Sequence, residues 1–470
     1  MIQAVTERGS MSQRILIVGG GVAGLSAGCY ARMNGYDATV FEQHTMAGGL
    51  CTAWRRQGFL FDGCIHFLVG SNPQSPLHRF WAEVGAGDFE YAHHDVNIQL
   101  EDGGRVLTLW ADPERLRQHM LELSTQDAAP INEFCDAVAH YPQCGRLRGL
   151  PMEHFSAEFR DPFLRKAMGS LGNLDFLLLT QAAYARRDAG FPLGGSLQLA
   201  HNLEQRFLAL GGQLRTGAKV ACVLVEGDRA VGVRLSDGTE HRGDRVISTA
   251  GFHPTVYGLL EGRYVDENIT ALTQQARVFP SSVQVSLGFD CDLSGEPHEV
   301  MVFQDQPLRL AGADRPAVYI KHYGFDRVLC PPGKAMVTTV LISDYHYWKS
   351  LREDPAAYRA EKEQVAQAFT RIVEQRFPQA RGRLRVVDVA TPLTYERYTD
   401  AWQGAYMGWQ STPEFPVRNV PSTLPGLRNF AMAGQWTYAG GGLPVALMSA
   451  RGALQRICAE EGREFVTTTA

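Results

Sequence analysis

The first fifty residues alternate between apolar runs of strand length and a segment with helical character. Residues 15–18 and 38–41 form two short apolar runs, and residues 22–34 lie between them. This middle segment places small residues on one side (Ala23, Ala27 and Ala31), and Gly35 follows as a typical helix end. The pattern predicts a strand–helix–strand unit over residues 14–42, in which the helix packs closely on a sheet.

Helical and strand-like patterns then occupy separate blocks of the chain. Residues 76–190 show mostly helical spacing, for example at 113–121 and 130–140, and leucine is dense between residues 171 and 179. A further helix is predicted at 197–210, with Ser196 as its N-cap residue. Short strands are predicted at 213–216, 220–226, 230–235 and 244–249, and residues 281–345 alternate in strand fashion. An amphipathic helix is predicted at 355–377, and a last helix begins at about Pro444.

A glycine-rich turn connects the first predicted strand to the first predicted helix. Gly19 permits a tight turn, Gly21 lets the backbone approach a pyrophosphate, and Gly24 lets helix and strand pack closely. The N–H groups of Val22 and Ala23, at the helix start, are then available to phosphate. A coincidental glycine-rich turn is the alternative, but a strand before the turn and a helix after it favour a dinucleotide-binding unit.

Other residues extend this predicted dinucleotide site. Glu42 ends the second apolar run, where an acidic side chain typically binds the hydroxyls of the adenosine ribose. Gly48 and Gly49 provide another place where backbone can press against the pyrophosphate. Val220, after a strand-like run, is a candidate contact for adenine, with an ordinary core position as the alternative.

A second glycine cluster near the other end of the chain indicates FAD rather than NAD. Gly434 and Gln435 follow an apolar run, and Gly441, Gly442 and Leu443 lead into the last predicted helix. A reduced flavin carries negative charge on its pyrimidine ring, which the positive end of a helix stabilises. A nicotinamide enzyme has no need of this second cluster, although a flexible loop would also contain glycines. The two clusters must therefore meet in space.

These patterns predict an α/β protein with a discontinuous Rossmann-type FAD-binding domain and an inserted α+β substrate-binding domain. We assign residues 12–75, 190–255 and 416–465 to the FAD-binding domain, and residues 76–189 and 256–415 to the substrate-binding, partly helical domain. The inserted domain is expected to contain a mixed or antiparallel sheet. No internal repeat or low-complexity linker interrupts this arrangement.

Composition and charge narrow the class of protein. A net charge of −5 with mixed signs argues against nucleic acid as a partner. The 9 cysteines are scattered, and neither they nor His93-His94 have metal-ligand spacing, so we expect no metal and a reduced, cytoplasmic setting. No apolar run reaches the length needed to span a bilayer. Residues 1–11 do not resemble a signal peptide, and Met11 leaves open whether those residues are native.

Several motifs together resemble the phytoene desaturase, carotenoid isomerase and retinol saturase family of flavoproteins. They are Gly19–Gly24, Glu42, Gly48-Gly49, Phe61-Asp62-Gly63, Phe191–Ser196, and Ala433-Gly434 with Gly440–Gly442. The resemblance is strongest at 14–70, 190–250 and 428–460. It implies FAD and an oxidoreductase that acts on a hydrophobic substrate. The chain departs from many relatives at Leu50, where they carry arginine, and at Gln435, where they carry an acidic residue.

His66 is the candidate catalytic residue. It is the only imidazole in the segment that the resemblance brings near the flavin ring, and it could donate or accept the proton that accompanies hydride transfer. A structural histidine bonded to a backbone carbonyl is the alternative. The resemblance also suggests that the segments Tyr395–Tyr398 and Tyr406–Trp409 line the substrate cavity, although their aromatic residues could equally be core.

Three functions remain open at this level. The first is desaturation, saturation or cis–trans isomerisation of carbon–carbon bonds in a long polyene or isoprenoid, by hydride exchange with flavin N5. The second is oxidation of an amine or a tetrapyrrole, and the third is a non-catalytic carrier of prenylated protein on the same scaffold. The intact glycine motifs and Glu42 argue against the third.

The expected partners are a hydrophobic small molecule and an electron acceptor or donor, which could be dioxygen, a quinone or a protein. A lipid-like substrate would make peripheral membrane association possible. In that case the leucine-rich stretch 171–179 would form a hydrophobic tunnel or an interfacial face, with an ordinary buried helix as the alternative. Sequence alone does not give the direction of reaction, the substrate or the oligomeric state.

Overall fold

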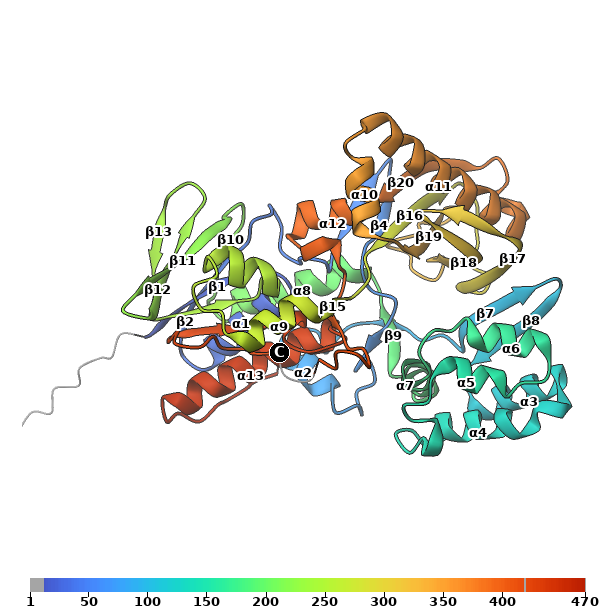
Figure 1. The fold of residues 1–470 in the computed structure, drawn as a ribbon, viewed down its shortest axis with the longest axis horizontal. Helices are drawn as coiled ribbons and strands as arrows, with labels where there is room; N and C mark the ends of the chain where they lie inside the picture. The colour runs from blue at the N-terminus through green and yellow to red at the C-terminus, as the bar shows by residue number, and fades with distance from the viewer. Residues whose placement is uncertain (1–11, 418–419, 470) are drawn as a thin grey trace, which may run out of the picture.

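The computed structural model describes residues 12–417 and 420–469. The chain forms two lobes, one built around a five-stranded sheet and the other around a seven-stranded sheet (Figure 1). The prediction of an α/β protein with a discontinuous Rossmann-type domain and an inserted α+β domain is confirmed. The domain boundaries given above stay a prediction.

The five-stranded sheet is parallel throughout and brings distant segments together. Its order is β10 (Gln213–Arg215), β2 (Asp37–Phe41), β1 (Arg14–Val18), β14 (Arg245–Ser248) and β22 (Phe430–Met432). All neighbouring strands are parallel. The buried residues of β1 and β2 are nearly continuous apolar runs, as expected for strands covered on both faces.

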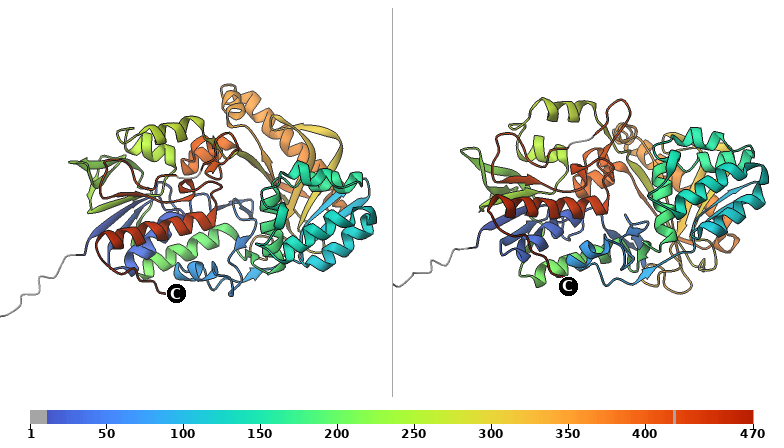
Figure 2. Two further views of the ribbon diagram at one scale, coloured as in Figure 1. Left: turned by 60° about the horizontal axis from the view of Figure 1, so that its bottom comes forward. Right: turned by 90° about the horizontal axis from the view of Figure 1, so that it is seen from below.

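Three helices cover one face of this sheet. They are α1 (Val22–Met33), α8 (Gly195–Ala209) and α13 (Leu443–Glu460), and α1 packs between the other two (Figure 2). The small residues Ala23, Ala27 and Ala31 of α1 are all buried in the hydrophobic cluster of this layer. Their size permits the close packing that the sequence predicts.

The opposite face carries a small antiparallel sheet and two short helices. The sheet comprises β11 (Val220–Glu226), β12 (Arg229–Leu235) and β13 (Glu240–Arg242), and the helices are a π-helix (Pro254–Leu259) and α9 (Glu267–Gln275). Residues of these elements share a hydrophobic cluster with Leu16, Val18 and Phe41 of the main sheet. The first lobe therefore has three layers.

The second lobe is built around a mixed seven-stranded sheet. Its order is β20 (Leu384–Ala390), β16 (Ser282–Phe289), β19 (Ala335–Ile342), β18 (Ala313–His322), β17 (Glu299–Leu310), β7 (Val96–Asp102) and β8 (Arg105–Trp110). Strands β17 and β7 are parallel, and the other neighbours are antiparallel. Of the two alternatives given for the inserted sheet, the mixed one is found.

Two groups of helices pack on this sheet. The first is α10 (Tyr345–Leu351) with α11 (Pro355–Arg376), whose apolar side includes Phe369 and Val373. The second group shares a hydrophobic cluster with β7 and β8. It contains α3 (Pro113–Leu123), α4 (Ala128–Ala139), α5 (Met152–Ala157), α6 (Pro162–Gly169) and α7 (Leu174–Ala185).

The leucine-rich stretch 171–179 includes the start of α7, and three of its five leucines are buried. Leu174, Leu177 and Leu178 are buried in the cluster that joins α7 to the neighbouring helices, whereas Phe176 is 57% exposed. This burial favours the ordinary helix over a tunnel or interfacial face. In the described parts of the chain, no helix is long and apolar enough to cross a membrane.

The remaining elements of the described chain are short. They are the hairpin β3 (Ala53–Arg56) and β4 (Phe59–Asp62), the strands β5 (Leu68–Val69), β6 (Tyr91–Ala92), β9 (Ala189–Pro192), β15 (Arg277–Val278) and β21 (Trp409–Gln410), the helices α2 (His78–Glu83) and α12 (Pro392–Thr399), and 3-10 turns at Thr125–Asp127, Gly145–Leu147, Pro378–Ala380, Trp402–Gly404 and Gln435–Thr437.

Two local predictions were wrong. Within the block predicted as mostly helical, β7 and β8 form a hairpin, and the alternating residues 96–102 before Gly103-Gly104 are the strand signal that was overlooked. Ser196 is not the N-cap of α8, because the helix begins at Gly195 with Gly194 as its cap. The Ser196 hydroxyl instead donates to Asp62 Oδ1 at 2.7 Å.

Candidate functional site

The loop after β1 brings α1 close to the carboxyl edge of the five-stranded sheet. Gly19 has a φ of +98°, which side chains rarely adopt, and its N–H donates to Phe41 O at 2.8 Å. A Cβ on Gly24 would clash with Gly19 O. Both glycines are therefore required by the fold itself.

Gly21 differs from these two glycines because it leaves space beside it. It is the N-cap of α1 in an extended conformation, and the nearest atoms to an added Cβ would be Gly48 O and Gly49 Cα, both 3.8 Å away. No side chain caps the first turn of α1, so the N–H groups of Val22 and Ala23 remain available for an anion. A pyrophosphate fits this uncapped turn.

Glu42 lies at the end of β2 and faces the same loop. Its Oε2 accepts from the Gly20 N–H at 2.7 Å and its Oε1 from the His44 N–H at 2.8 Å. Each carboxylate oxygen has a second lone pair, so the side chain can still accept hydrogen bonds from ribose hydroxyls. Glu42 is 6% exposed, and its two backbone bonds hold it in one orientation.

The remaining predicted contacts of the adenosine and pyrophosphate lie around this carboxylate. The Gly48 N–H donates to Gly20 O at 2.9 Å, which places Gly48 and Gly49 across the glycine loop. The Ala218 N–H donates to Glu42 O at 2.8 Å, and Val220 follows as the first residue of β11. Val220 is buried opposite Leu235, so the core alternative also describes its position.

The carboxyl-terminal glycine cluster reaches the start of α1, as expected from the sequence. Strand β22 pairs with β14, which pairs with β1, and a Cβ on Gly434 would lie 3.8 Å from Ala23 Cβ. The Gly434 N–H donates to Ser449 Oγ at 2.8 Å. The two glycine motifs therefore lie together at one edge of the sheet, which is where ligands bind in open parallel sheets.

Gln435 and the glycines after it shape the start of α13. Gln435 Oε1 accepts from the Gly442 N–H at 3.4 Å, and a Cβ on Gly441 would lie 2.9 Å from Gly408 N. Helix α13 begins at Leu443 and no side chain caps it. Its positive end is therefore available to a group with developing negative charge.

The start of helix α8, in the same lobe, is bonded to two carboxylates. Asp326 Oδ2 accepts from the Gly194 N–H at 2.7 Å, and Asp62 Oδ2 accepts from the Ser196 N–H at 2.6 Å. Burial raises the pKa of Asp62, although its hydrogen bonds with Ser196 act in the opposite direction. Two of the motifs that resemble the family, Phe61-Asp62-Gly63 and Phe191–Ser196, are thus joined by hydrogen bonds between Asp62 and Ser196. In contrast, the starts of α1 and α13 have no side-chain cap.

Thr249 is a residue of this site that the sequence analysis missed. Its hydroxyl donates to Val18 O at 2.9 Å and to Gly19 O at 3.0 Å, so it ties the end of β14 to the glycine loop. A Cβ on Gly24 would lie 3.0 Å from this hydroxyl. Its place just after a parallel strand is the signal that could have identified it.

His66 lies between the two lobes beside a buried ion pair. The Lys321 ammonium donates to His66 O at 2.9 Å and lies 3.0 Å from Glu299 Oε1. The His66 ring lies 3.4 Å from the Tyr319 hydroxyl through Nδ1. Lys321, Glu299 and Tyr319 were not found from the sequence, although the charge of Lys321 inside the apolar run 317–323 is a detectable signal.

This environment keeps the imidazole neutral. Burial, and then the charge of Lys321, lower the pKa of His66 to about 4. Burial alone would raise the pKa of Glu299, but Lys321 and His66 lower it. Glu299 is therefore ionised, while His66 carries no charge at neutral pH.

A second imidazole pair extends the cluster. His94 and His298 stack with ring centroids 3.6 Å apart, and Phe325 packs edge-on against His94 at 4.5 Å. Burial and the neighbouring His298 lower the pKa of His94 to about 2, and burial with Lys321 holds the pKa of His298 well below its ordinary value. Among residues 12–417 and 420–469, no group of three or more potential metal ligands is placed to bind an ion.

In the aromatic segments suggested by the resemblance, Trp409 is buried, Tyr395 and Tyr406 are half-buried, and Tyr398 is exposed. The Tyr395 hydroxyl donates to Gln284 Oε1 at 3.4 Å, and burial raises the pKa of Tyr406 to about 12. Trp409 donates through its ring N–H to Trp436 O at 3.1 Å, next to the carboxyl-terminal glycine cluster. Both segments therefore lie near that cluster or near Asp62, whose carbonyl accepts from Gln284 at 2.7 Å.

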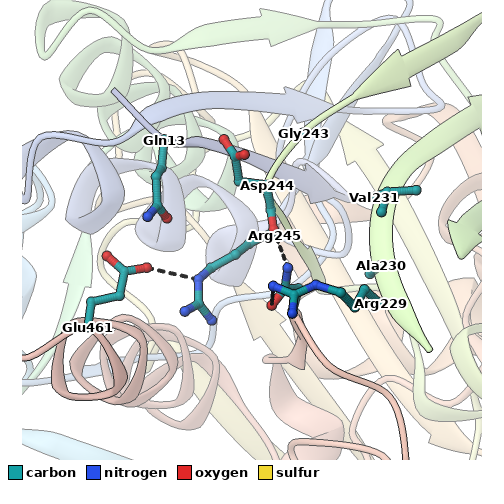
Figure 3. A pocket seen from close by; sticks show the side chains of 9 residues that line it. Gln13, Arg229, Ala230, Val231, Gly243, Asp244, Arg245 and Glu461 are labelled. Atoms are coloured by element: carbon teal, nitrogen blue, oxygen red, sulfur yellow. Dashed lines mark hydrogen bonds and ion pairs between the residues drawn. The ribbon is translucent and has the colours of Figure 1, made fainter. Parts of the chain in front are cut away.

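A surface cavity of about 360 Å³ lies at the opposite edge of the sheet (Figure 3). Its lining includes Gln13 and Asp244, which precede β1 and β14, so it is at the amino ends of the strands. Arg245, which also lines it, is neutralised by Glu460 and Glu461 at 2.7 and 3.0 Å. This cavity is remote from both glycine motifs and is not the cofactor site.

Comparison with known protein families gives one match over nearly the whole chain. The family of flavin-containing amine oxidoreductases matches residues 22–458. This match confirms the flavin cofactor and the oxidoreductase class that the two glycine motifs predicted. The individual site residues remain proposals.

Curated relatives are similar at low identity over most of their length. All-trans-retinol 13,14-reductase of Danio rerio is 21% identical, over 86% of this chain and 80% of its own. A phytoene desaturase (lycopene-forming) of a Paracoccus species is 23% identical, over 94% and 96%. Chloroplastic prolycopene isomerase of Daucus carota is 23% identical, over 96% and 80%.

Solved structures share the fold. An oxidoreductase from Methanosarcina mazei superimposes with a TM-score of 0.62 at 17% identity, covering 94% of this chain and 100% of its own. A putative protoporphyrinogen oxidase from Exiguobacterium gives 0.58 at 18% identity, over 96% and 99%. At these identities the likeness establishes the fold alone.

We expect Gly21→Val to give a folded protein without FAD. A side chain at this position meets no protein atom within 3.8 Å, and valine tolerates the extended backbone, but the methyl groups would occupy the space assigned to the pyrophosphate. The ratio of flavin absorbance to protein, measured with the melting temperature, tests this. Gly452→Val in α13, where an added Cβ meets nothing within 4 Å, should keep its FAD. A folded Gly21→Val protein with full FAD would contradict the assignment.

The neutral histidines should make stability fall in mild acid. Because His66, His94 and His298 have pKa values below the ordinary 6.5, the unfolded chain binds protons first as the pH drops. The contribution is complete above pH 6.5 and is lost as the pH falls toward 4. His94→Phe removes one group that takes up a proton on unfolding. The slope of the unfolding free energy against pH should therefore fall by about 1.4 kcal/mol per pH unit near pH 5. Denaturant titrations at several pH values measure it, and the exposed His154→Phe should keep the wild-type slope.

Proposed function

Because the chain belongs to the family of flavin-containing amine oxidoreductases, we propose that this FAD-dependent enzyme acts on carbon–carbon bonds of a long hydrophobic polyene or isoprenoid. The reaction is a desaturation, a saturation or a cis–trans isomerisation. The proposal concerns the substrate class and the bond that reacts, since the oxidoreductase class follows from the family.

The observation that carries this proposal is the agreement among the curated relatives. Three of them, from an animal, a bacterium and a plant, are named for reduction, desaturation and isomerisation of retinol, phytoene and prolycopene. All three names describe a reaction at carbon–carbon bonds that are conjugated or become conjugated, although the reactions differ in direction. The similarity covers 86 to 96% of this chain.

In this proposal FAD would bind at the carboxyl edge of the first sheet. Gly19, Gly21, Gly24 and the N–H groups of Val22 and Ala23 bind the pyrophosphate with Gly48 and Gly49, Glu42 binds the ribose, and Val220 contacts adenine. Gly434, Gln435, Gly441, Gly442 and Leu443 hold the isoalloxazine end, next to the positive end of α13. When bound, FAD supplies hydride acceptor and donor chemistry at N5.

His66 is the proposed proton-transfer residue. Its neutral imidazole can hold a proton on one ring nitrogen while Tyr319 fixes the orientation of Nδ1. The lowered pKa makes it a weak base, which suits a conjugated substrate because the polyene itself delocalises developing charge. The Lys321–Glu299 pair holds the backbone of His66 in place through its carbonyl.

The electron partner follows from the direction of reaction. A desaturase passes electrons to dioxygen, a quinone or another protein, a saturase receives them, and an isomerase needs no net acceptor. A substrate of this class partitions into lipid, so we place the protein in the cytoplasm with peripheral contact to a membrane surface. All nine cysteines are thiols in the structure, which fits a reducing compartment.

Anaerobic incubation of the holoprotein with phytoene, prolycopene and all-trans-retinol should reveal turnover. Bleaching of the flavin absorbance indicates desaturation, reoxidation of chemically reduced protein indicates saturation, and isomerised product from reduced protein at constant absorbance indicates isomerisation. Products are identified by mass and chromatography. Putrescine and protoporphyrinogen are the comparison substrates, and flavin reduction by either, with no change in any polyene, would replace the proposal with the amine or tetrapyrrole alternative.

We expect His66→Ala to slow turnover of the reactive polyene by roughly 10²–10⁴ while FAD stays bound. Loss of the imidazole removes the group that moves the proton, whereas the cofactor contacts lie on other segments. Tyr319→Phe keeps the ring packing and removes the hydroxyl that orients His66, so a smaller loss is expected. A near-normal rate for His66→Ala with full flavin content would assign the residue a structural role.

A further inference from the structure

Cys51 and Cys64 face each other at the open end of the β3–β4 hairpin. The two-residue turn Gln57-Gly58 has positive φ at both positions, and the register pairs Arg56 with Phe59 and Ala53 with Asp62. The Gly63 N–H donates to Thr52 O at 2.9 Å, which extends the same register by one residue. The next pair in that register is Cys51 with Cys64.

This position has the spacing that a disulfide requires. Because the Gly63 N–H donates to Thr52 O, Cys51 and Cys64 follow at a non-hydrogen-bonded position of the register, where the Cα atoms of a regular ladder are about 4.5 Å apart. Disulfides join Cα atoms separated by about 4.4–6.8 Å. A hydrogen bond with the Cys64 thiol, and then burial, raise the pKa of Cys51 well above its ordinary value.

The two thiols differ in access. Cys51 is 1% exposed and its Sγ donates to Ser196 O at 3.1 Å, whereas Cys64 is partly exposed. Cys222 is also partly exposed, but it lies opposite Arg234 in its sheet. A small oxidant therefore reaches Cys64 before Cys51, and the Cys51 thiol is the neighbour that can react with the oxidised Cys64.

We infer that Cys51 and Cys64 form a site of reversible two-electron oxidation, in which a hydroperoxide converts the two thiols into a disulfide. The Cys64 sulfur attacks hydrogen peroxide, an S–O bond forms, the O–O bond breaks and one water leaves. The Cys51 sulfur then attacks the Cys64 sulfur, an S–S bond forms, the S–O bond breaks, and the Cys51 proton departs with hydroxide as a second water. Both sulfur atoms are oxidised and the peroxide is reduced.

The arrangement limits oxidation to a reversible stage. A sulfenic acid with no thiol nearby proceeds to sulfinic acid, which ordinary reductants do not reverse, whereas a disulfide returns to two thiols by exchange. The disulfide would also join the Gly48–Cys51 turn to the segment after Asp62. This inference does not depend on the substrate of the enzyme.

The sequence makes the disulfide directly measurable in the holoprotein. Trypsin cleaves at Arg55 and Arg56, so Cys51 and Cys64 fall on separate peptides, residues 33–55 and 57–79. After a graded dose of hydrogen peroxide and blocking of the remaining thiols, non-reducing mass mapping should find these peptides linked. A thiol reductant should restore both. Sulfenic or sulfinic acid on Cys64 without linkage, or unlinked peptides at a dose that oxidises Cys222, would overturn the inference.

Variants separate the pair from general thiol reactivity. Cys51→Ser keeps a donor for Ser196 O and should lose the linked peptide, while Cys64 gains two oxygen atoms that a thiol reductant does not remove. Cys222→Ser, the matched control, should retain the linkage. Should Cys51→Ser fail to fold, mapping of the wild-type protein decides alone. Reversible reduction of Cys64 in a folded Cys51→Ser protein would refute the role of Cys51.

Discussion

The close seating of α1 on the loop after β1 is the contact on which the cofactor site depends. Gly24 packs against Gly19 O and the Thr249 hydroxyl, and a side chain there would push the helix away from the sheet. Because the helix sits this deeply, its uncapped first turn reaches the edge where β14 and β22 end. Gly434 and the start of α13 then meet the same edge, so both positive helix ends are available to one elongated ligand, as we propose for FAD.

Much of this lobe could be predicted from the sequence because local patterns determine it. The apolar runs 15–18 and 38–41, the small residues of α1 and the glycines between them each require only their neighbours. The hairpin β7–β8 was overlooked, since a short alternating run inside a helical block is a weak signal. The cap of α8 was assigned to Ser196 on local grounds, whereas the structure supplies carboxylates from Asp62 and Asp326, which are distant in sequence.

The surroundings of His66 could not be predicted for the same reason. Its partners Tyr319 and Lys321 come from β18, and Glu299 comes from β17, so the cluster exists only after the second sheet has formed. Charges that cancel as a pair, together with imidazoles that stay neutral, give this buried region polarity without net charge. Such a region can orient a side chain and still tolerate an uncharged, conjugated neighbour.

The parallel pairing of β22 with β14 has a consequence for biosynthesis. Strand β22 and helix α13 follow the whole second lobe in the sequence, yet they complete the sheet whose strand β1 begins at Arg14. The ribosome must therefore release the second lobe before the carboxyl edge of the first sheet can close. Strands β1 and β14 lack some of their partners while the second lobe is being synthesised. During this period their unpaired backbone groups can pair with other chains or bind chaperones.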